Sequence, residues 1–473
     1  MTHYERFYID GAWVEPLERR TLDVIDPSTE AAFATIAIGS SADVDRACCA
    51  ARAAFPAFAA TTREERIALL ERIVAVYQRR YQEFADAISR EMGAPIGLAT
   101  RAQAAMAVAH FATAIEALRH DPFEEDMGTT RVFREPIGVC ALITPWNWPG
   151  NQIACKVAPA LATGCTMVLK PSEIAPIDAI LFAEVLHEAG VPAGVFNLVN
   201  GDGPGVGSAL AAHPEVDMVS FTGSTRAGIL VAKAAADTVK RVCQELGGKS
   251  ANILLDDADF GSALLSALGV CFHAGQGCAI ATRLLVPKSR QAEAEEILKT
   301  YFGYIQYGNP AAEDQIMGPL INKRQQERVL GYIERGKQEG ARLLLGGGRP
   351  AQLPRGCYVE PTVFVDVTND MTIAREEIFG PVLAVIAYEN EEDAIRIAND
   401  SVYGLSGAVW SADEARALRV ARRIRTGTIN VNGGNFYATD APFGGYKQSG
   451  LGREMGAEGF EEYLETKTIA IRV

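Results

Sequence analysis

The stretch IGVCALITPWNWPGNQIACKVAPALATGCTMVLK, residues 137–170, decides the fold. It opens with an apolar run over 137–143, which predicts a buried strand, and it closes with a second apolar run over 166–170. Residues 151–163 between these runs have a pattern typical of a helix. A strand, a helix and a second strand in this order indicate a unit in which the two strands lie parallel.

The same alternation continues to residue 244. We predict strands over 195–199, 217–221 and 240–244, and helices over 176–188, 206–212 and 225–236. This order predicts the α/β class with a doubly wound parallel sheet. Sheets of this kind bind ligands at the carboxyl ends of their strands, where helix N-termini offer free N–H groups.

The opening third of the chain is predicted to be helical. Thr62 and Glu65 form a capping box, and Gly93 and Pro95 stop the helix that follows. The apolar residues that recur between them at steps of three and four are Ile67, Leu70, Val74, Tyr77, Tyr81, Phe84 and Ile88.

A second α/β unit is predicted after residue 250, followed by an irregular segment and a tail. Its strands are expected over 252–255, 284–287, 382–386, 405–410 and 428–431. Glycines mark the irregular segment at positions 433, 434, 444, 445, 450 and 452. The tail over 466–473 alternates like a strand with a free edge, which favours pairing with another subunit, so we expect a homodimer or homotetramer.

The composition excludes several classes of protein. With 473 residues, 48% hydrophobic and 22% charged, the chain is globular. A net charge of −14 argues against a nucleic-acid partner and against docking on an anionic membrane. The first residues show no secretory signal, and the longest apolar stretch, 157–169, is too short to span a bilayer. Nine cysteines without a C-x-x-C pair indicate free thiols in a reducing, cytoplasmic compartment, and no metal site is expected.

Three turns that follow predicted strands are candidates for holding a phosphate or a ribose. The glycines at 201, 203, 205 and 207 miss the G-x-G-x-x-G spacing because position 206 is valine, which favours a simple glycine-rich turn. Gly223 and Ser224 open a helix, where they bind a phosphate or where Ser224 only caps the helix. Lys170 and Glu173 grip two ribose hydroxyls or form a solvated charged turn.

Three other segments carry side chains that suit catalysis. Cys278 has small neighbours that leave its sulfur accessible, although most cysteines are buried hydrophobes. Glu245 precedes a Gly-Gly turn and is either a general base or part of a surface loop. Asn147 lies between two tryptophans, so its amide either stabilises an oxyanion or belongs to a rigid loop. His273 lies five residues before Cys278, but closeness in sequence does not imply hydrogen-bond reach.

Seven segments occur together and in one order. They are Pro145-Trp-Asn147, Lys170-Pro-Ser-Glu173, Phe221-Thr-Gly-Ser224, Glu245-Leu-Gly-Gly248, Gly275-Gln-Gly-Cys278, Glu377-Ile-Phe379-Gly-Pro381 and Pro442-Phe-Gly-Gly-Tyr-Lys447. This set resembles the NAD(P)-dependent aldehyde dehydrogenase superfamily over essentially the whole chain.

The resemblance implies a fold and a division into domains. The fold is α/β, with a Rossmann-like doubly wound parallel sheet that binds NAD without the usual glycine fingerprint. A second α/β catalytic domain and a small β extension for oligomerisation complete it. The resemblance implies an NAD-binding domain over 1–118 and 137–247, a catalytic domain over 248–447, and oligomerisation segments over 119–136 and 448–473.

The resemblance also implies roles for individual residues. Cys278 matches the nucleophile, Glu245 the general base, Asn147 the oxyanion-holding amide and Lys156 a lysine that helps to relay protons. The residues that match the cofactor site are Ile143, Thr144, Pro145, Trp146, Lys170, Ser172, Glu173, Gly203, Phe221, Gly223, Ser224, Leu246, Gly247, Glu377 and Phe379. The residues expected in the substrate tunnel are Trp148, Asn151, Gln152, Cys155, Asn435, Tyr437 and Phe443.

Two departures from the family concern the substrate. Gly277 and Ala279 flank the nucleophile, where many relatives have bulky or thiol residues. Cys155 stands where some relatives carry an aromatic residue, which predicts a wider tunnel. Apart from Lys156, none of the tunnel residues is basic, so we expect neutral aromatic or medium-chain aldehydes rather than dicarboxylic semialdehydes.

The expected reaction is the NAD-dependent oxidation of an aldehyde to a carboxylic acid through a thiohemiacetal and a thioester on Cys278. NADP stays possible, but its 2′-phosphate would meet the like charge of Glu173. The alternatives are an enzyme that transfers the acyl group to coenzyme A, a cysteine esterase that needs no cofactor, and a binding protein without activity. Relatives that use coenzyme A usually lack the glutamate found at 245, which favours water as the acceptor.

Overall fold

The computed structural model describes residues 2–434 and 438–472. Its largest sheet has eight strands in the order β22-β12-β11-β8-β9-β10-β2-β3. The five strands from β12 to β10 pair in parallel, and the strands at both edges pair antiparallel. The predicted parallel sheet is therefore confirmed. The bounds are β2 (Phe7–Ile9), β3 (Ala12–Val14), β8 (Val139–Ile143), β9 (Thr166–Lys170), β10 (Phe196–Leu198), β11 (Met218–Thr222), β12 (Arg241–Glu245) and β22 (Gly450–Leu451).

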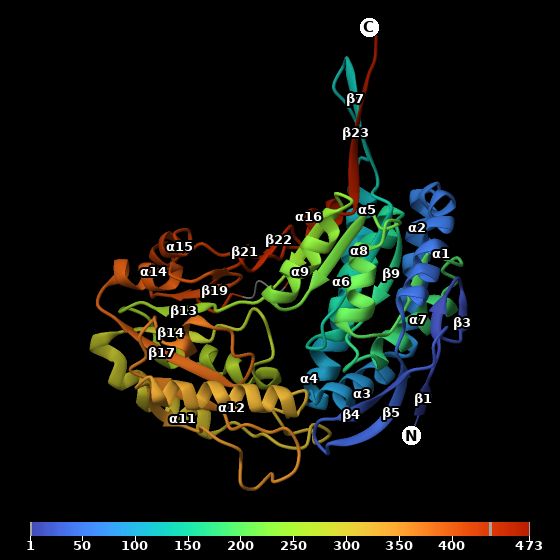
Figure 1. The fold of residues 1–473 in the computed structure, drawn as a ribbon. Coiled ribbons are helices and arrows are strands. Elements are labelled where there is room, and N and C mark those ends of the chain that lie inside the picture. Colours follow the sequence, from blue (N-terminus) through green and yellow to red (C-terminus); the bar gives the residue numbers. More distant parts are fainter. Residues whose placement is uncertain (1, 435–437, 473) are drawn as a thin grey trace.

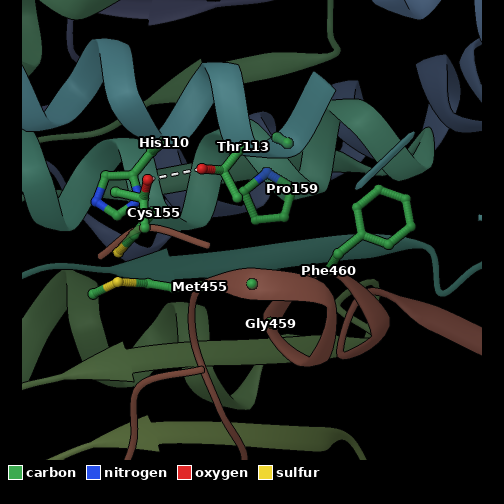
Figure 2. A pocket seen from close by; sticks show the side chains of 10 residues that line it. His110, Thr113, Cys155, Pro159, Met455, Gly459 and Phe460 are labelled. Atoms are coloured by element: carbon green, nitrogen blue, oxygen red, sulfur yellow. Dashed lines mark hydrogen bonds between the residues drawn. The ribbon is translucent and has the colours of Figure 1, made fainter. Parts of the chain in front are cut away.

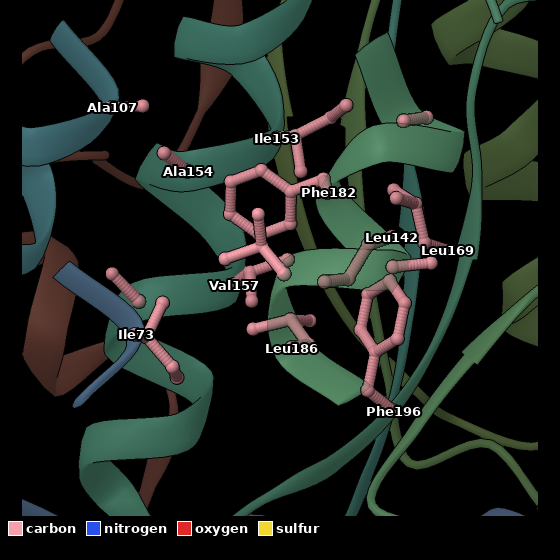
Figure 3. Packing of buried hydrophobic residues seen from close by; sticks show 14 of the residues in the cluster. Ile73, Ala107, Leu142, Ile153, Ala154, Val157, Leu169, Phe182, Leu186 and Phe196 are labelled. Atoms are coloured by element: carbon pink, nitrogen blue, oxygen red, sulfur yellow. The ribbon is translucent and has the colours of Figure 1, made fainter. Parts of the chain in front are cut away.

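Helices cover both faces of this sheet. Cys140 and Leu142 of β8 pack into one hydrophobic cluster, while Val139 and Ala141 pack into another, because successive strand residues point to opposite faces. Figure 3 shows how the first cluster closes over the sheet. The helices around the sheet are α1 (Ser41–Ala59), α2 (Arg63–Arg79), α3 (Tyr81–Met92), α4 (Ile96–Leu98), α5 (Ala104–His120), α6 (Pro149–Thr163), α7 (Ile177–Glu188), α8 (Ser208–Ala212) and α9 (Thr225–Ala236).

The predicted second α/β unit forms a seven-stranded sheet in the order β15-β16-β17-β14-β13-β19-β20. All neighbours in it pair in parallel except β15 with β16. Its strands are β13 (Ala251–Leu254), β14 (Arg283–Pro287), β15 (Arg342–Leu345), β16 (Thr362–Val365), β17 (Val382–Tyr388), β19 (Gly407–Trp410) and β20 (Asn430–Val431). Its helices are α10 (Phe260–Leu265), α11 (Gln291–Gly303), α12 (Lys323–Gln338), α13 (Thr372–Arg375), α14 (Glu391–Asn399) and α15 (Glu414–Ala421).

The C-terminal strand belongs to a ribbon that stands out from the body of the molecule (Figure 1). β23 (Leu464–Ala470) pairs antiparallel with β7 (Thr130–Pro136), which also pairs with β6 (Glu124–Asp126). One edge of the tail is therefore covered within the chain. The remaining elements are β1 (Thr2–Tyr4), β4 (Thr21–Asp26), β5 (Ala31–Ala37), β18 (Tyr403–Gly404), β21 (Tyr446–Lys447) and α16 (Gly456–Glu461).

The opening third is less helical than the sequence predicts, because residues 2–37 contain five strands. The predicted helix after Thr62 is also two helices, which part at Arg80, where φ is −103° and ψ is 9°. The apolar pattern crosses this break because both helices face one core, in which the rings of Tyr77 and Phe84 stack at 4.2 Å. Strands β15 and β16 were not predicted, and the strand expected over 405–410 starts at residue 407.

Residues 2–434 and 438–472 lack two features that would point to a membrane or a metal ion. No helix among them combines the length and the apolar character that crossing a membrane requires. No group of three or more histidine, cysteine or acidic residues among them is arranged to hold a metal ion.

Candidate active site

Cys278 lies in a turn that the surrounding backbone holds tightly. The chain before it passes through left-handed conformations at His273, Ala274 and Gly275, with φ of 55°, 52° and 73°. A Cβ atom on Gly275 would lie 2.1 Å from the carbonyl oxygen of Gly380, so this position admits only glycine. A Cβ atom on Gly248 would lie 2.5 Å from the Cys278 carbonyl oxygen, so the turn after Glu245 packs directly against the cysteine.

The thiol of Cys278 is not ionised at neutral pH in the protein alone. Burial, together with the nearby carboxylates of Glu377 and Glu245, raises its pKa to about 12. Acidic groups from two segments therefore act on the sulfur. The thiol reacts as a thiolate only when a nearby base or a bound cation removes or offsets this penalty.

Glu245 is the last residue of β12 and is buried, with 2% of its surface exposed. Neither carboxylate oxygen has a hydrogen-bond partner within the described residues. Burial raises the pKa of Glu245 well above its ordinary value, and the carboxylate of Glu454 adds to the shift. In its ionised form, such a carboxylate is a stronger base than an exposed one, and both of its oxygens are available to accept a proton from a molecule that enters the site.

Asn147 and Gln276 hold the turn on its other side. The Nδ2 atom of Asn147 donates to the Gln276 carbonyl at 3.1 Å, which leaves its second N–H for another acceptor. The Gln276 side chain donates to the His273 carbonyl at 3.0 Å and accepts from the Ile321 N–H at 2.9 Å. This fixes the backbone that leads to Cys278.

His273 is a packing residue in this structure. Its ring lies edge-on to Trp148, with 6.0 Å between the centroids. Burial lowers the pKa of His273 to about 4, so the imidazole is neutral at physiological pH. Its Nε2 atom has no hydrogen-bond partner in the part of the chain that the structure describes, so it does not bond to Cys278.

The residues expected to bind a cofactor ribose lie where β8 and β9 end. Lys170 ends β9, and its Nζ atom lies 3.2 Å from Oε2 of Glu173. Burial lowers the pKa of Lys170, and the charge of Glu173 opposes this effect. Thr144 follows β8, and its hydroxyl oxygen is buried without a hydrogen-bond partner among the described residues. Ser172, two residues after Lys170, is also buried.

Two further groups complete the expected cofactor site. Ser224 caps α9 by accepting the Ala227 N–H at 3.3 Å, and it follows Phe221, Thr222 and Gly223 at the end of β11. Glu377 accepts the Gly248 N–H at 2.9 Å. The remaining expected residues are Ile143 and Pro145 around the end of β8, Trp146 edge-on to Phe379 with 5.4 Å between centroids, Gly203 at the start of a short π-helical turn, and Leu246 and Gly247 after Glu245.

Lys156 is fully buried and carries a charge that the structure neutralises. Its Nζ atom contacts the carboxylate of Glu454 and the hydroxyl groups of Ser220 and Thr222, the latter at 3.1 and 2.7 Å. Burial by itself lowers the pKa of Lys156, but the charge of Glu454 outweighs it, so the pKa is raised. Glu454 also accepts the Cys155 S–H at 3.3 Å and so joins two neighbouring residues of α6.

The expected tunnel residues come from α6 and from the segment near Phe443. Met455 forms a small buried cluster with Leu405 and Phe443, and Cys278 packs against it. The indole nitrogen of Trp148 lies 3.9 Å from where a Cβ atom on Gly277 would be. Asn151, Gln152 and Cys155 are all buried on α6. Asn435 and Tyr437 lie outside the described residues.

Comparison with known proteins assigns the chain. The model of the aldehyde dehydrogenase family matches residues 13–469. The chain belongs to the aldehyde dehydrogenase family. It is 54% identical over 472 residues, or 99% of both chains, to 3-succinoylsemialdehyde-pyridine dehydrogenase from a Pseudomonas species. It is 47% identical, again over 99% of both chains, to a putative aldehyde dehydrogenase of Staphylococcus saprophyticus.

Solved structures of other aldehyde dehydrogenases share the fold over almost the whole chain. Aldehyde dehydrogenase C of Pseudomonas syringae, solved as a mutant with NAD+ and octanal, is 52% identical with a TM-score of 0.97 and covers 98% of this chain and 96% of its own. Aldehyde dehydrogenase of Bartonella henselae is 45% identical with a TM-score of 0.98 over all of both chains. Betaine aldehyde dehydrogenase of Staphylococcus aureus, solved with NAD+, is 40% identical with a TM-score of 0.96 and covers 98% of this chain and 94% of its own.

The sequence interpretation of this aldehyde dehydrogenase missed Glu454. The residue lies 298 positions from Lys156 in sequence, and no motif links the two. One signal was available, since a lysine inside an apolar helix such as α6 needs an acidic partner when it is buried. That rule predicts that a partner exists but does not say which of 59 acidic residues supplies it.

Proposed function

We propose that this chain oxidises an uncharged aldehyde to the carboxylic acid, with Cys278 as nucleophile, Glu245 as general base and NAD as cofactor. The observation that carries the proposal is the pair formed by a half-buried thiol and a buried carboxylate whose oxygens have no partner among the described residues. Within the part of the chain that the structure describes, no side-chain hydrogen bond of Glu245 explains its burial. Relatives that are named or solved as aldehyde dehydrogenases support the same assignment.

The residues around the ends of β8, β9 and β11 fit NAD. The buried hydroxyl group of Thr144 has no partner among the described residues, so it is available for a hydrogen bond to the cofactor. Lys170 and Glu173 bond to each other, and each keeps further donor or acceptor positions for the ribose hydroxyls. In our proposal Lys170 and Glu173 hold a ribose, Ser224 and the start of α9 hold the pyrophosphate, and Glu377 with Phe379 holds the nicotinamide half. When bound, NAD supplies the acceptor for the hydride that an aldehyde must lose on oxidation.

The chain's own residues account for the remaining chemistry. The Cys278 sulfur attacks the aldehyde carbon, and the free N–H of Asn147 together with the backbone N–H of Cys278 stabilises the oxyanion. Oxidation of this adduct leaves a thioester on Cys278. Glu245 accepts a proton from water, which attacks the thioester and releases the acid. Lys156, with its charge held by Glu454, is proposed to relay protons near the site.

An assay with a panel of aldehydes tests the proposed function. NADH should form with neutral aliphatic and aromatic aldehydes and more slowly with succinic semialdehyde, since none of the described residues expected in the tunnel is an arginine. Two relatives point the same way, because one is named for a pyridine semialdehyde and another was solved with octanal. Hydrolysis of esters without any NADH formation would instead show a cysteine esterase, and a requirement for coenzyme A would show an acylating enzyme.

Cofactor choice provides a second prediction. The 2′-phosphate of NADP would meet the charge of Glu173, at a cost of a few kcal/mol. We expect kcat/KM to be at least about tenfold higher with NAD, because about 1.4 kcal/mol corresponds to a factor of ten. Glu173→Gln should reduce this preference, whereas Glu188→Gln, which changes an exposed carboxylate of α7, should not. A higher kcat/KM with NADP in the unchanged enzyme would contradict the prediction.

We also propose the domain division into residues 1–118 and 137–247 for NAD binding, 248–447 for catalysis, and 119–136 and 448–473 for oligomerisation.

The ribbon made by β23, β7 and β6 supports a homodimer or homotetramer. We expect truncation after Leu464 to yield monomers or aggregates, because it removes the partner of β7 and leaves that strand without a neighbour on one side. Light scattering at micromolar concentration measures the effect. Full-length chain that is monomeric under these conditions would contradict it.

Nine free cysteines support a reducing, cytoplasmic location.

A further inference from the structure

Two carboxyl groups lie fully buried where α3 meets α7. Glu91 is in the last turn of α3, Asp178 is in the first turn of α7, and both side chains have 0% of their surface exposed. Carboxyl groups are seldom buried completely unless a cation or several hydrogen bonds replace the water that they lose. Neither group belongs to the candidate active site, so the chemistry described above does not explain their burial.

Glu91 provides hydrogen bonds for the start of α7. Its two carboxyl oxygens accept the backbone N–H groups of Ile177 at 2.7 Å and of Asp178 at 3.2 Å. These are the first two N–H groups of the helix, and the residue at its N-cap, Pro176, forms no side-chain cap. The positive end of the α7 dipole stabilises one negative charge at this place, but not a second one.

Asp178 has no comparable partners. Within the part of the chain that the structure describes, neither of its carboxylate oxygens has a hydrogen-bond partner, and no basic side chain is among the groups that act on its charge. Polar groups elsewhere in the interior are paired. The hydroxyls of Thr113 and Thr439, for example, bond to each other at 2.7 Å in the wall of a small cavity beside Cys155 (Figure 2). The burial of Asp178 therefore needs a partner that the ionised form does not have.

A proton held between the two carboxyl groups supplies that partner. The side chains of Glu91 and Asp178 lie within hydrogen-bond reach of each other. Two ionised carboxylates offer only acceptors, whereas a protonated carboxyl group donates to an ionised one. Burial and the charge of Asp178 raise the pKa of Glu91 well above its ordinary value, and burial raises the pKa of Asp178 to about 7. The two groups titrate as one unit that keeps a proton at neutral pH.

The surrounding groups offer no charge that replaces this proton. Tyr77 faces the pair from α2 and is neutral, because burial raises its pKa well above the ordinary value, and its hydroxyl already donates to a backbone carbonyl. Tyr4 approaches from β1, where the charge of Glu91 helps to raise its pKa. Arg90 follows the same helix as Glu91 but places its guanidinium over the ring of Phe33, at 4.4 Å from the centroid.

The pair also contacts the helix that follows the oxyanion-holding amide. A Cβ atom on Gly150 would lie 3.7 Å from Oδ2 of Asp178, so the first turn of α6 packs directly against this carboxyl group. α6 begins at Pro149, two residues after Asn147. The ends of three helices therefore meet at the two carboxyl groups, and one of these helices starts at the candidate active site.

We propose that Glu91 and Asp178 share one proton in the folded chain, and that this proton holds the ends of α3 and α7 together beneath the start of α6. When the proton is lost at alkaline pH, two like charges face each other without water or a cation, and the junction is destabilised. The pair is a pH-sensitive support of the active site and not a catalytic group. Its test measures unfolding and not turnover, so the result is independent of the proposed function.

The direction of the pH dependence follows from the protons that each state binds. In the unfolded chain both groups ionise near their ordinary pKa values, about 3.9 for aspartate and 4.3 for glutamate. Between those values and the raised pKa of the pair, the folded chain holds one proton more than the unfolded chain. The stability that the pair contributes is therefore largest at low pH. It falls as pH rises, by about tenfold in the ratio of folded to unfolded chain for each pH unit.

Asp178→Asn tests the shared proton. Asparagine keeps the shape of the side chain, and its amide donates to Glu91 at every pH. Between pH 6 and pH 9, we expect the midpoint of thermal unfolding to fall at least about 2 °C further in the unchanged chain than in the variant. Asp86→Asn, which changes an exposed carboxylate on α3, should keep the full pH dependence. Other groups that titrate in this range are present in all three proteins and cancel in the comparison.

Glu91→Gln is the reciprocal variant. Its amide donates to Asp178, but its single oxygen replaces two acceptors for the N–H groups of α7. It should therefore unfold at a lower temperature at every pH, with the same weakened pH dependence as Asp178→Asn. Infrared difference spectra at pH 7 provide a direct observation. The carbonyl band of a protonated carboxylic acid should be present in the unchanged chain and lost in Asp178→Asn.

Three results would overturn the proposal. The midpoints of Asp178→Asn and Glu91→Gln could fall with pH as steeply as that of the unchanged chain. The carboxylic acid band could persist unchanged in Asp178→Asn, which would place the proton elsewhere. Asp86→Asn could weaken the pH dependence as much as Asp178→Asn does, which would assign the dependence to the overall charge of the surface. If one of the two buried variants does not fold, as judged by circular dichroism, the other decides the result.

Discussion

Cys278→Ala is expected to abolish NADH formation and ester hydrolysis together. Both reactions need a covalent bond between the sulfur and a carbonyl carbon, and alanine cannot form it. The substitution removes one atom from a half-buried side chain, so the fold should persist and the loss should be chemical. Absorbance of NADH and of a released phenol from an aryl ester measure the two reactions on the same preparation.

An exposed cysteine offers a matched control. Cys49→Ala changes the same pair of residue types on the surface of α1 and should keep both activities. The pH dependence gives a further check, because burial raises the pKa of Cys278 to about 12. In the enzyme without cofactor, alkylation of Cys278 by iodoacetamide should therefore become faster as pH rises. As long as the pH is below the pKa, each increase of one pH unit raises the fraction of thiolate about tenfold. Appreciable NADH formation by Cys278→Ala would remove Cys278 from the mechanism.

The central sheet could be predicted because its signal is local and strong. Residues 166–170 match β9 at both ends, and 225–236 matches α9, because a buried parallel strand is a continuous apolar run and a capped helix has a clear start. Strands β1 to β5 lack such runs, because they are short strands that pair mainly with one another, and β2 also joins β10 across about 190 residues. Pairing of this kind leaves little trace in the local pattern.

The candidate site divides in the same way. Cys278, Glu245 and Asn147 each lie in short segments whose order resembles a family, and the structure brings electrostatic or hydrogen-bond contacts of all three to one turn. The environment of these residues could not be predicted. The 298-residue separation of Lys156 from Glu454, and the cavity beside Cys155, depend on how α5, α6 and the C-terminal segment pack. Packing is a property of the assembled fold and not of any one motif.

Glu245→Gln should fail in a different way from Cys278→Ala. Glutamine keeps the shape of the side chain but cannot accept a proton. Acylation of Cys278 and hydride loss remain possible, most readily at a pH where the thiol is partly ionised. Hydrolysis of the thioester should slow by roughly 10²–10⁴, the usual range for losing a general base. Rapid mixing should therefore show a burst of NADH of at most one per active site, followed by a very slow steady rate.

The structure also gives the pH dependence of this step. Burial and the charge of Glu454 raise the pKa of Glu245, so the fraction of the carboxylate that can act as a base increases with pH. The steady rate of the unchanged enzyme should fall as pH drops through that raised pKa, and this dependence should be absent in Glu245→Gln. Mass spectrometry of the variant during turnover should find the acyl group on Cys278.

Two results would change the role of Glu245. If the carboxylate must first deprotonate the thiol, the burst in Glu245→Gln disappears at neutral pH and returns only as pH approaches the pKa of Cys278, because hydroxide then replaces the missing base. The acyl adduct would be absent at neutral pH in that case, which distinguishes this result from slow hydrolysis. Near-normal steady turnover by Glu245→Gln would contradict both versions, since no other described carboxyl group near Cys278 is buried with both oxygens unpartnered.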